Sequence, residues 1–163
     1  MYKAILLLSL VLAFLTGCSE EPAAPKGNEP AAIHFAVITT GNNSGIQADM
    51  TSIYKLDTQQ SFDEFWAQHS KNLQPPITAP VIDFNKDMVI AVVDSDQPSS
   101  GYEMSIDKLQ AVDTKLYIFA TRKQPGAGCV NLGMISQPFI MIEVPKSDLI
   151  PELRMNTETI ACQ

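Results

Sequence analysis

Hydrophobic positions in residues 61–70 recur at the spacing of one buried helical face, and they belong to Phe62, Phe65, Trp66 and His69. Ser61 is followed three residues later by Glu64, which fits a capping box with Ser61 as the N-cap. The next segment, residues 72–80, contains three prolines and cannot continue a helix. The pattern therefore predicts one short amphipathic helix that begins near Ser61.

The other patterned segments are typical of strands. Residues 88–93 form a continuous apolar run, as expected for a strand buried on both faces. Residues 102–107 alternate between apolar and polar side chains, and residues 116–121 are predicted to pair with them across the Asp113-Thr114 turn. Four further strands are predicted at residues 33–40, 51–56, 139–144 and 153–160. We expect a mainly β (α+β) fold, a compact antiparallel sandwich or barrel-like domain with one short helix.

The beginning of the chain has the order of a secretory signal. Lys3 supplies a positive charge, residues 4–15 are dominated by apolar side chains, and small residues precede Cys18. The apolar run is shorter than the about 20 residues that a membrane-spanning helix needs. The sequence Leu15-Thr16-Gly17-Cys18 resembles a bacterial lipoprotein signal, which implies that Cys18 is acylated and becomes the first mature residue. The alternative is a signal peptide with a chance cysteine.

The expected organisation is a signal peptide at residues 1–17, a lipidated cysteine with a flexible tether at residues 18–32, and one β-rich domain at residues 33–163. The tether has three prolines and few apolar side chains, so it is not expected to form a core. Ser19 follows Cys18 and is compatible with sorting to the outer membrane. We expect a lipid-anchored envelope protein that faces the periplasm.

Net charge excludes some classes of partner. The chain has 11 basic and 18 acidic side chains, and loss of residues 1–17 removes one lysine and leaves a formal charge of −8. Nucleic-acid binding requires an excess of lysine and arginine, and so does attachment to anionic lipid through a polybasic segment. Membrane contact is therefore expected through the N-terminal lipid, and no nucleic-acid partner is expected.

Two cysteines remain for the folded domain, Cys129 and Cys162. An even pair in an oxidising compartment favours a disulfide bond, which would stabilise the fold by roughly 3–4 kcal/mol for a loop of this length. The alternative is a pair of free thiols with a redox or metal-binding role. No C-x-x-C motif and no cysteine–histidine spacing accompanies them, so no metal or other cofactor is predicted.

A series of short motifs recurs in a fixed order along the domain. They are Phe65-Trp66 with His69 and the segments 80–84, 88–91, 100–106, 125–129 and 137–139. Together they resemble the PrcB-like C-terminal domain, named for an accessory lipoprotein of a surface protease complex. The resemblance covers residues 62–144 and leaves residues 33–56 outside. It implies a small β-rich envelope module that binds or stabilises a protease, and it brings no catalytic residues.

Two loops are candidates for partner binding. The first is Ser99, Ser100, Gly101 and Tyr102, where Gly101 is expected to adopt a positive φ. This loop weakly resembles a binding loop of the chagasin-like peptidase inhibitors, and the alternative is a simple hairpin-like turn. The second candidate contains Pro125, Gly126 and Gly128, and its alternative is a loop shaped to hold the disulfide bond.

No catalytic arrangement is found in the sequence. The chain lacks the G-x-S-x-G and H-E-x-x-H motifs. Asp83 is expected to cap a turn, and Asp94 and Asp96 are expected to be solvated loop carboxylates. We therefore expect a non-enzymatic binding module for an envelope protein, plausibly a protease. A strict peptidase inhibitor and a structural lipoprotein without a dedicated partner are the alternatives.

Overall fold

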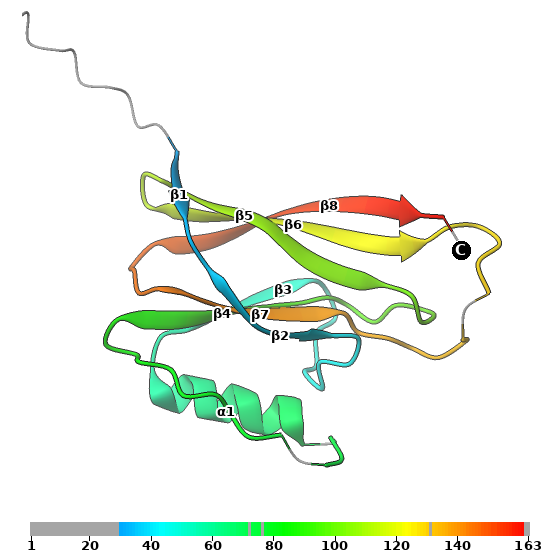
Figure 1. Cartoon of the computed structure of the whole chain (residues 1–163), viewed down its shortest axis with the longest axis horizontal. Coiled ribbons are helices and arrows are strands. Elements are labelled where there is room, and N and C mark those ends of the chain that lie inside the picture. The colour runs from blue at the N-terminus through cyan, green and yellow to red at the C-terminus, as the bar shows by residue number, and fades with distance from the viewer. Residues whose placement is uncertain (1–29, 72, 76, 131, 162–163) are drawn as a thin grey trace, which may run out of the picture.

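Two four-stranded β-sheets and one helix are stacked as three layers (Figure 1). The computed structural model describes residues 30–71, 73–75, 77–130 and 132–161. The predicted signal peptide, Cys18 and Cys162 lie outside the described residues. Within the described part, no helix is long and apolar enough to cross a membrane.

The strands form an outer sheet and a central sheet. The outer sheet has the order β1-β5-β6-β8, and the central sheet has the order β2-β7-β4-β3. In chain order the elements are β1 (Ala31–Ile33), β2 (Ala36–Gly41), β3 (Ser52–Leu56), α1 (Gln59–Ser70), β4 (Asp87–Val93), β5 (Glu103–Val112), β6 (Lys115–Pro125), β7 (Phe139–Pro145) and β8 (Ile150–Ile160). No strand pairs across the two sheets in the described chain, so the predicted sandwich is confirmed as an open sandwich and not a closed barrel.

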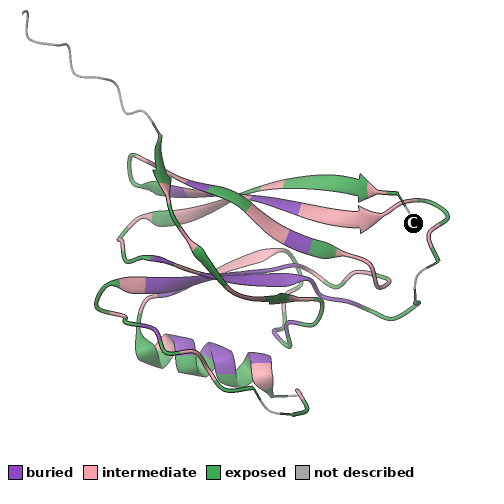
Figure 2. Ribbon diagram, in the orientation of Figure 1, coloured by how far each residue is buried: buried purple, intermediate pink, exposed green. Residues whose placement is uncertain are grey.

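The central sheet is covered on both faces, and Figure 2 shows the buried residues concentrated there. In β4, Met88, Ile90 and Val92 belong to the hydrophobic cluster between the two sheets. The alternate side chains, Val89, Ala91 and Val93, belong to the cluster beneath α1. Because both faces of β4 are buried, an alternating pattern is impossible, and the continuous apolar run is the pattern expected of such a strand.

Helix α1 covers the central sheet with the predicted face, since Phe62, Phe65, Trp66 and His69 are its buried residues. Its predicted start was wrong. The N-cap is Thr58, whose side chain accepts a hydrogen bond from the Ser61 backbone N–H at 3.1 Å. The Ser61 hydroxyl in turn lies 3.3 Å from the Thr58 backbone nitrogen, so Ser61 fills the third helical position of the capping box.

Two strand predictions also need correction. The segment 33–40 is not one strand, because the chain leaves the outer sheet after β1 and joins the central sheet as β2. The last strand begins at Ile150 and runs parallel to β6, which is an exception in a mainly antiparallel fold. The predicted pairing of β5 with β6 is confirmed, and Asp113 in the turn between them has a φ of 53°.

A buried ion pair connects the two sheets. Asp94 follows β4 and is fully buried, which contradicts its predicted solvation, whereas Asp96 is exposed as expected. Arg122, on β6 of the outer sheet, donates to both carboxylate oxygens of Asp94, with Nε–Oδ2 at 2.6 Å and Nη2–Oδ1 at 2.5 Å. Thr51 also donates to Oδ1, at 2.6 Å. The carboxylate is buried because a bidentate partner and a hydroxyl group replace its water.

The parallel pairing of β6 and β8 brings the last strand residues next to the glycine-rich loop. Pro125 is aligned with Ile160, and the Gly126 N–H donates to the Ile160 carbonyl at 2.9 Å. This alignment brings the segment that contains Cys129 close to the end of β8, two residues before Cys162. The disulfide bond between the two cysteines stays a prediction, since Cys162 lies outside the described residues.

Replacement of Asp94 by asparagine is expected to destabilise the fold. The variant leaves the Arg122 guanidinium, whose side chain is 22% exposed, without its anion. We expect a loss of about 2–4 kcal/mol in the free energy of unfolding, measured by urea denaturation. Asp148→Asn removes an equal charge from an exposed loop and should change stability by less than about 0.5 kcal/mol. Equal stability of the two variants would show that the ion pair contributes nothing.

The predicted disulfide bond can be tested with Cys162→Ser. Loss of a bridge worth roughly 3–4 kcal/mol should lower the melting temperature by about 10 °C under oxidising conditions without abolishing the fold. In reducing buffer, the wild type and the variant should melt together. An unchanged melting temperature under oxidising conditions would contradict the bridge.

Candidate functional site

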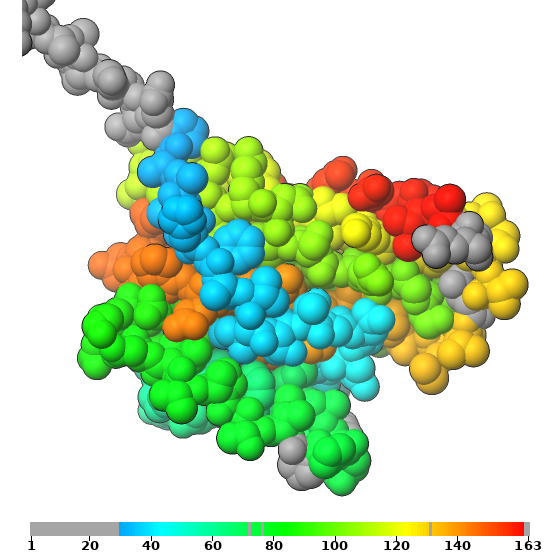
Figure 3. All heavy atoms as spheres, viewed as in Figure 1, coloured from blue at the N-terminus to red at the C-terminus, as the bar shows by residue number. Residues whose placement is uncertain are grey.

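Three loops meet at one end of the sandwich, which we call the loop end. They are residues 42–51, 94–102 and the described part of 126–138, and they join strands that begin or end there. Figure 3 shows the third loop, in yellow and orange, forming the extremity of the molecule. The chain enters β1 at the opposite end (Figure 1).

Hydrogen bonds join the second loop to the third. The Ser100 N–H donates to the Leu132 carbonyl, and the Leu132 N–H donates to the Ser100 hydroxyl, both at 3.0 Å. Gln97 and Ser136 exchange two backbone hydrogen bonds at 2.7 and 3.1 Å, and the Ser136 hydroxyl donates to the Ser99 carbonyl at 2.7 Å. The two loops therefore form one connected surface whose backbone is held in place.

The predicted site residues divide between two environments. Ser99 and Ser100 contact the third loop, Gly101 has the expected positive φ of 90°, and Tyr102 is half-buried beside them. The segment that contains Pro125, Gly126 and Gly128 instead lies along the end of β8. The structure thus places both candidate loops at the loop end, but Ser99 and Ser100 bond to residues 132–136, which the sequence reasoning had not singled out.

The third loop exposes a group of large apolar side chains, which we call the apolar loop: Val130, Leu132, Met134 and Ile135. Val130 is fully exposed, and the other three are 63–70% exposed. Exposed apolar side chains gathered on one loop are typical of an interaction surface. The sequence contained a signal for this group, because four large apolar residues are unusual in a short loop that follows Gly126 and Gly128 and precedes a strand.

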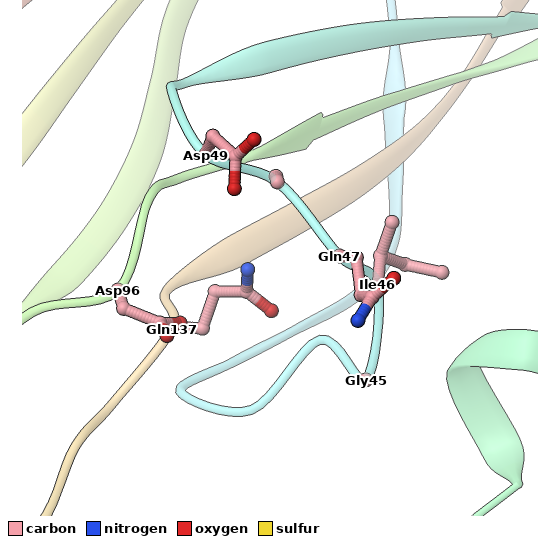
Figure 4. Close-up of a pocket in the computed structure, with 7 residues that line it drawn as sticks. Gly45, Ile46, Gln47, Asp49, Asp96 and Gln137 are labelled. Carbon is pink, nitrogen blue, oxygen red and sulfur yellow. The ribbon is translucent and has the colours of Figure 1, made fainter.

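A polar pocket of about 380 Å³ lies between the first loop and the other two, and its lining residues are drawn in Figure 4. Residues 45–49, Asp96 and Gln137 line it. The first loop is fixed to α1, since Nδ1 of His69 lies 2.7 Å from the Ser44 carbonyl oxygen. Gly45 has a φ of 67°, and a Cβ there would lie 2.9 Å from the His69 carbonyl oxygen, so both backbone conformation and close contact require glycine.

Two exposed ion pairs shift pKa values at the end opposite to the loops. A hydrogen bond from Lys115 lowers the pKa of Glu152, and the same contact raises the pKa of Lys115. The hydrogen bond from Lys86 likewise lowers the pKa of Asp83, whose carboxylate also caps the Asn85 N–H as predicted. The loop end, in contrast, presents apolar side chains and the exposed side chains of Asp49 and Asp96.

The donor set does not point to a metal centre. Across the described ranges, no group of three or more His, Cys, Asp and Glu side chains is placed to hold a metal ion. The polar pocket contributes two carboxylates, from Asp49 and Asp96. Both of these side chains belong to exposed residues.

Comparison with known families finds a match over the segment that carries the second and third loops. The model of the PrcB C-terminal family matches residues 88–145, which run from β4 to β7 and include the second and third loops. The match leaves out α1 and the motifs before Met88 that contributed to the sequence resemblance. No curated protein and no solved structure matches the chain. Residues 88–145 of the chain are therefore similar to the PrcB C-terminal family.

Proposed function

We propose that this protein is an accessory module of the bacterial envelope that binds a protease, or a member of a protease complex, through the apolar loop. The family resemblance supports an accessory and non-enzymatic role in such a complex. The single observation that carries the proposal is the exposure of four large apolar side chains within six residues at one end of the domain.

The apolar loop is suited to binding because it is held before the partner arrives. The bonds between Ser100 and Leu132, and between Gln97 and Ser136, restrict the backbone on which the apolar side chains stand. A preorganised loop loses less conformational entropy on association. Burial of its side chains against a partner would supply roughly 25 cal/mol per Å² of apolar surface. A few such anchors carry most of the affinity in protein interfaces.

The position of the apolar loop favours a protein partner over the anchoring membrane. The chain enters the fold at β1, at the end opposite to the loops (Figure 1). With Cys18 acylated, residues 19–30 would span at most about 40 Å and would keep the β1 end within that distance of the bilayer. The loop end lies at the other end of the domain from this attachment and would be accessible to other envelope proteins.

The predicted chagasin-like inhibitor mode has less support. In that mode the loop of Ser99 to Tyr102 would enter a peptidase cleft. Here the Ser100 hydroxyl accepts the Leu132 N–H, and Tyr102 is half-buried, so the apolar loop projects further than this loop does. We therefore favour attachment to the partner outside its catalytic cleft, which stabilises or regulates the enzyme without blocking it.

In-cell crosslinking followed by pull-down and mass spectrometry tests the proposal. The wild-type chain should capture a protease or a component of its complex, and Leu132→Ser with Ile135→Ser should reduce that capture at least about tenfold, because two anchors are lost. The matched control is Ile150→Ser with Val81→Ser, since these are exposed apolar side chains away from the loop end. Undiminished capture by the loop variant would overturn the proposed site, and capture of no protease would overturn the proposed function.

A further inference from the structure

We infer that the polar pocket beside the apolar loop binds one basic side chain, best an arginine, of the partner polypeptide. The inference rests on the proposed function and specifies the chemistry of the partner segment: a basic residue next to apolar ones. The pocket volume of about 380 Å³ lies near the lower end of the range for ligand sites, which suits a single side chain.

Two carboxylates from different loops line the pocket without a protein counter-ion. Asp49 belongs to the first loop and Asp96 to the second. Within the described chain, neither has an ion pair or a side-chain hydrogen bond, and no lysine or arginine lines the pocket. Asp94 differs, because Arg122 already neutralises it. The pocket therefore presents two uncompensated negative charges, which attract a cation from a partner.

A buried amide supplies a second and independent indication of a ligand. Gln137 is 91% buried, and its side-chain oxygen Oε1 accepts a hydrogen bond from the Ser44 hydroxyl. Its amide nitrogen has no acceptor among the described residues. That nitrogen is also not enclosed by protein atoms. Figure 4 shows this amide among the side chains that surround the pocket. A ligand that enters the pocket can therefore offer an acceptor to this donor in place of solvent.

An arginine within a peptide can interact with both the two carboxylates and the amide donor of the pocket. Its guanidinium has five N–H donors and can face two carboxylates at once. The peptide carbonyl next to it can accept from the Gln137 amide nitrogen. A metal ion would make no use of that donor, and two carboxylates fall short of the six to eight oxygen ligands of calcium.

The C-terminus of α1 adds to the negative potential at the pocket. A Cβ on Gly45 would lie 2.9 Å from the His69 carbonyl oxygen and 3.2 Å from that of Gln68, so the last turn of the helix adjoins the pocket wall. The C-terminal end of a helix carries about half a negative charge from its aligned peptide dipoles. This field also favours a cation over a neutral or anionic group.

The pocket and the apolar loop form one surface. Gln137 lies two residues after Ile135, and Asp96 precedes Gln97, which pairs with Ser136. A partner segment that places an apolar side chain on the apolar loop therefore brings its neighbouring residue to the pocket. This continuity is why we assign the basic group to the protein partner and not to a separate small molecule.

The test is an NMR titration of the purified full chain with an acetylated and amidated leucine-arginine-leucine peptide. We expect shifts confined to residues 45–49, 95–97 and 132–137. The citrulline version, which keeps the shape of arginine but is neutral, should bind about tenfold more weakly. Asp49→Asn and Asp96→Asn should each weaken binding of the arginine peptide about threefold, as expected for exposed ion pairs. Asp148→Asn, the matched control at the other end of the domain, should leave the affinity unchanged.

Equal affinity for the arginine and citrulline peptides would overturn the inference, and so would Asp96→Asn binding as tightly as Asp148→Asn. Calcium chloride that shifts the same resonances, when the peptide shifts none, would reassign the pocket to a cation. The outcomes distinguish failure of the pocket inference from failure of the proposed function. If crosslinking still captures a protease through the apolar loop while the peptide does not bind, only the pocket inference falls. If the peptide binds but no protease is captured, the proposed function falls.

Discussion

The burial of the central sheet on both faces is the constraint on which the rest of the structure depends. β4 and β7 are mainly apolar on each side, because one face meets the outer sheet and the other meets α1. Apart from the half-buried Glu143 in β7, polar and charged groups therefore lie at or beyond the ends of these strands. Asp94 lies one residue past β4, and Gln137 lies two residues before β7. The chemistry of the loop end is thus a direct result of where two apolar strands stop.

The sequence was sufficient for features that depend on local pattern. The helical face of Phe62, Phe65 and Trp66 and the apolar run of β4 could be predicted because each repeats over neighbouring residues. The helix start was missed because Thr58 and Ser61 offer the same capping chemistry three residues apart. Pattern also could not reveal that residues 33–40 change sheets, since β1 and β2 are each chosen by distant partners, β5 and β7.

The candidate site was predicted less completely, because it depends on contacts between distant segments. Asp94 and Asp96 look alike in sequence, and only Arg122, 28 residues from Asp94, decides that one is buried and the other exposed. The loop of Ser99 to Tyr102 was found through its glycine and its resemblance. Its bonding to Leu132 and the pocket formed by Asp49, Asp96 and Gln137 come from three loops that only the fold assembles.

The parallel direction of β8 has a consequence for how the binding surface is maintained. The strand ends at the loop end, where the Ile160 carbonyl holds the Gly126 N–H at the base of the third loop. Neither hydrophobic cluster draws a residue from positions 156–160. Loss of residues 156–160 would therefore spare both cores and remove the hydrogen bond at the base of the third loop. The geometry of that loop and the packing of the cores thus depend on different parts of the same strand.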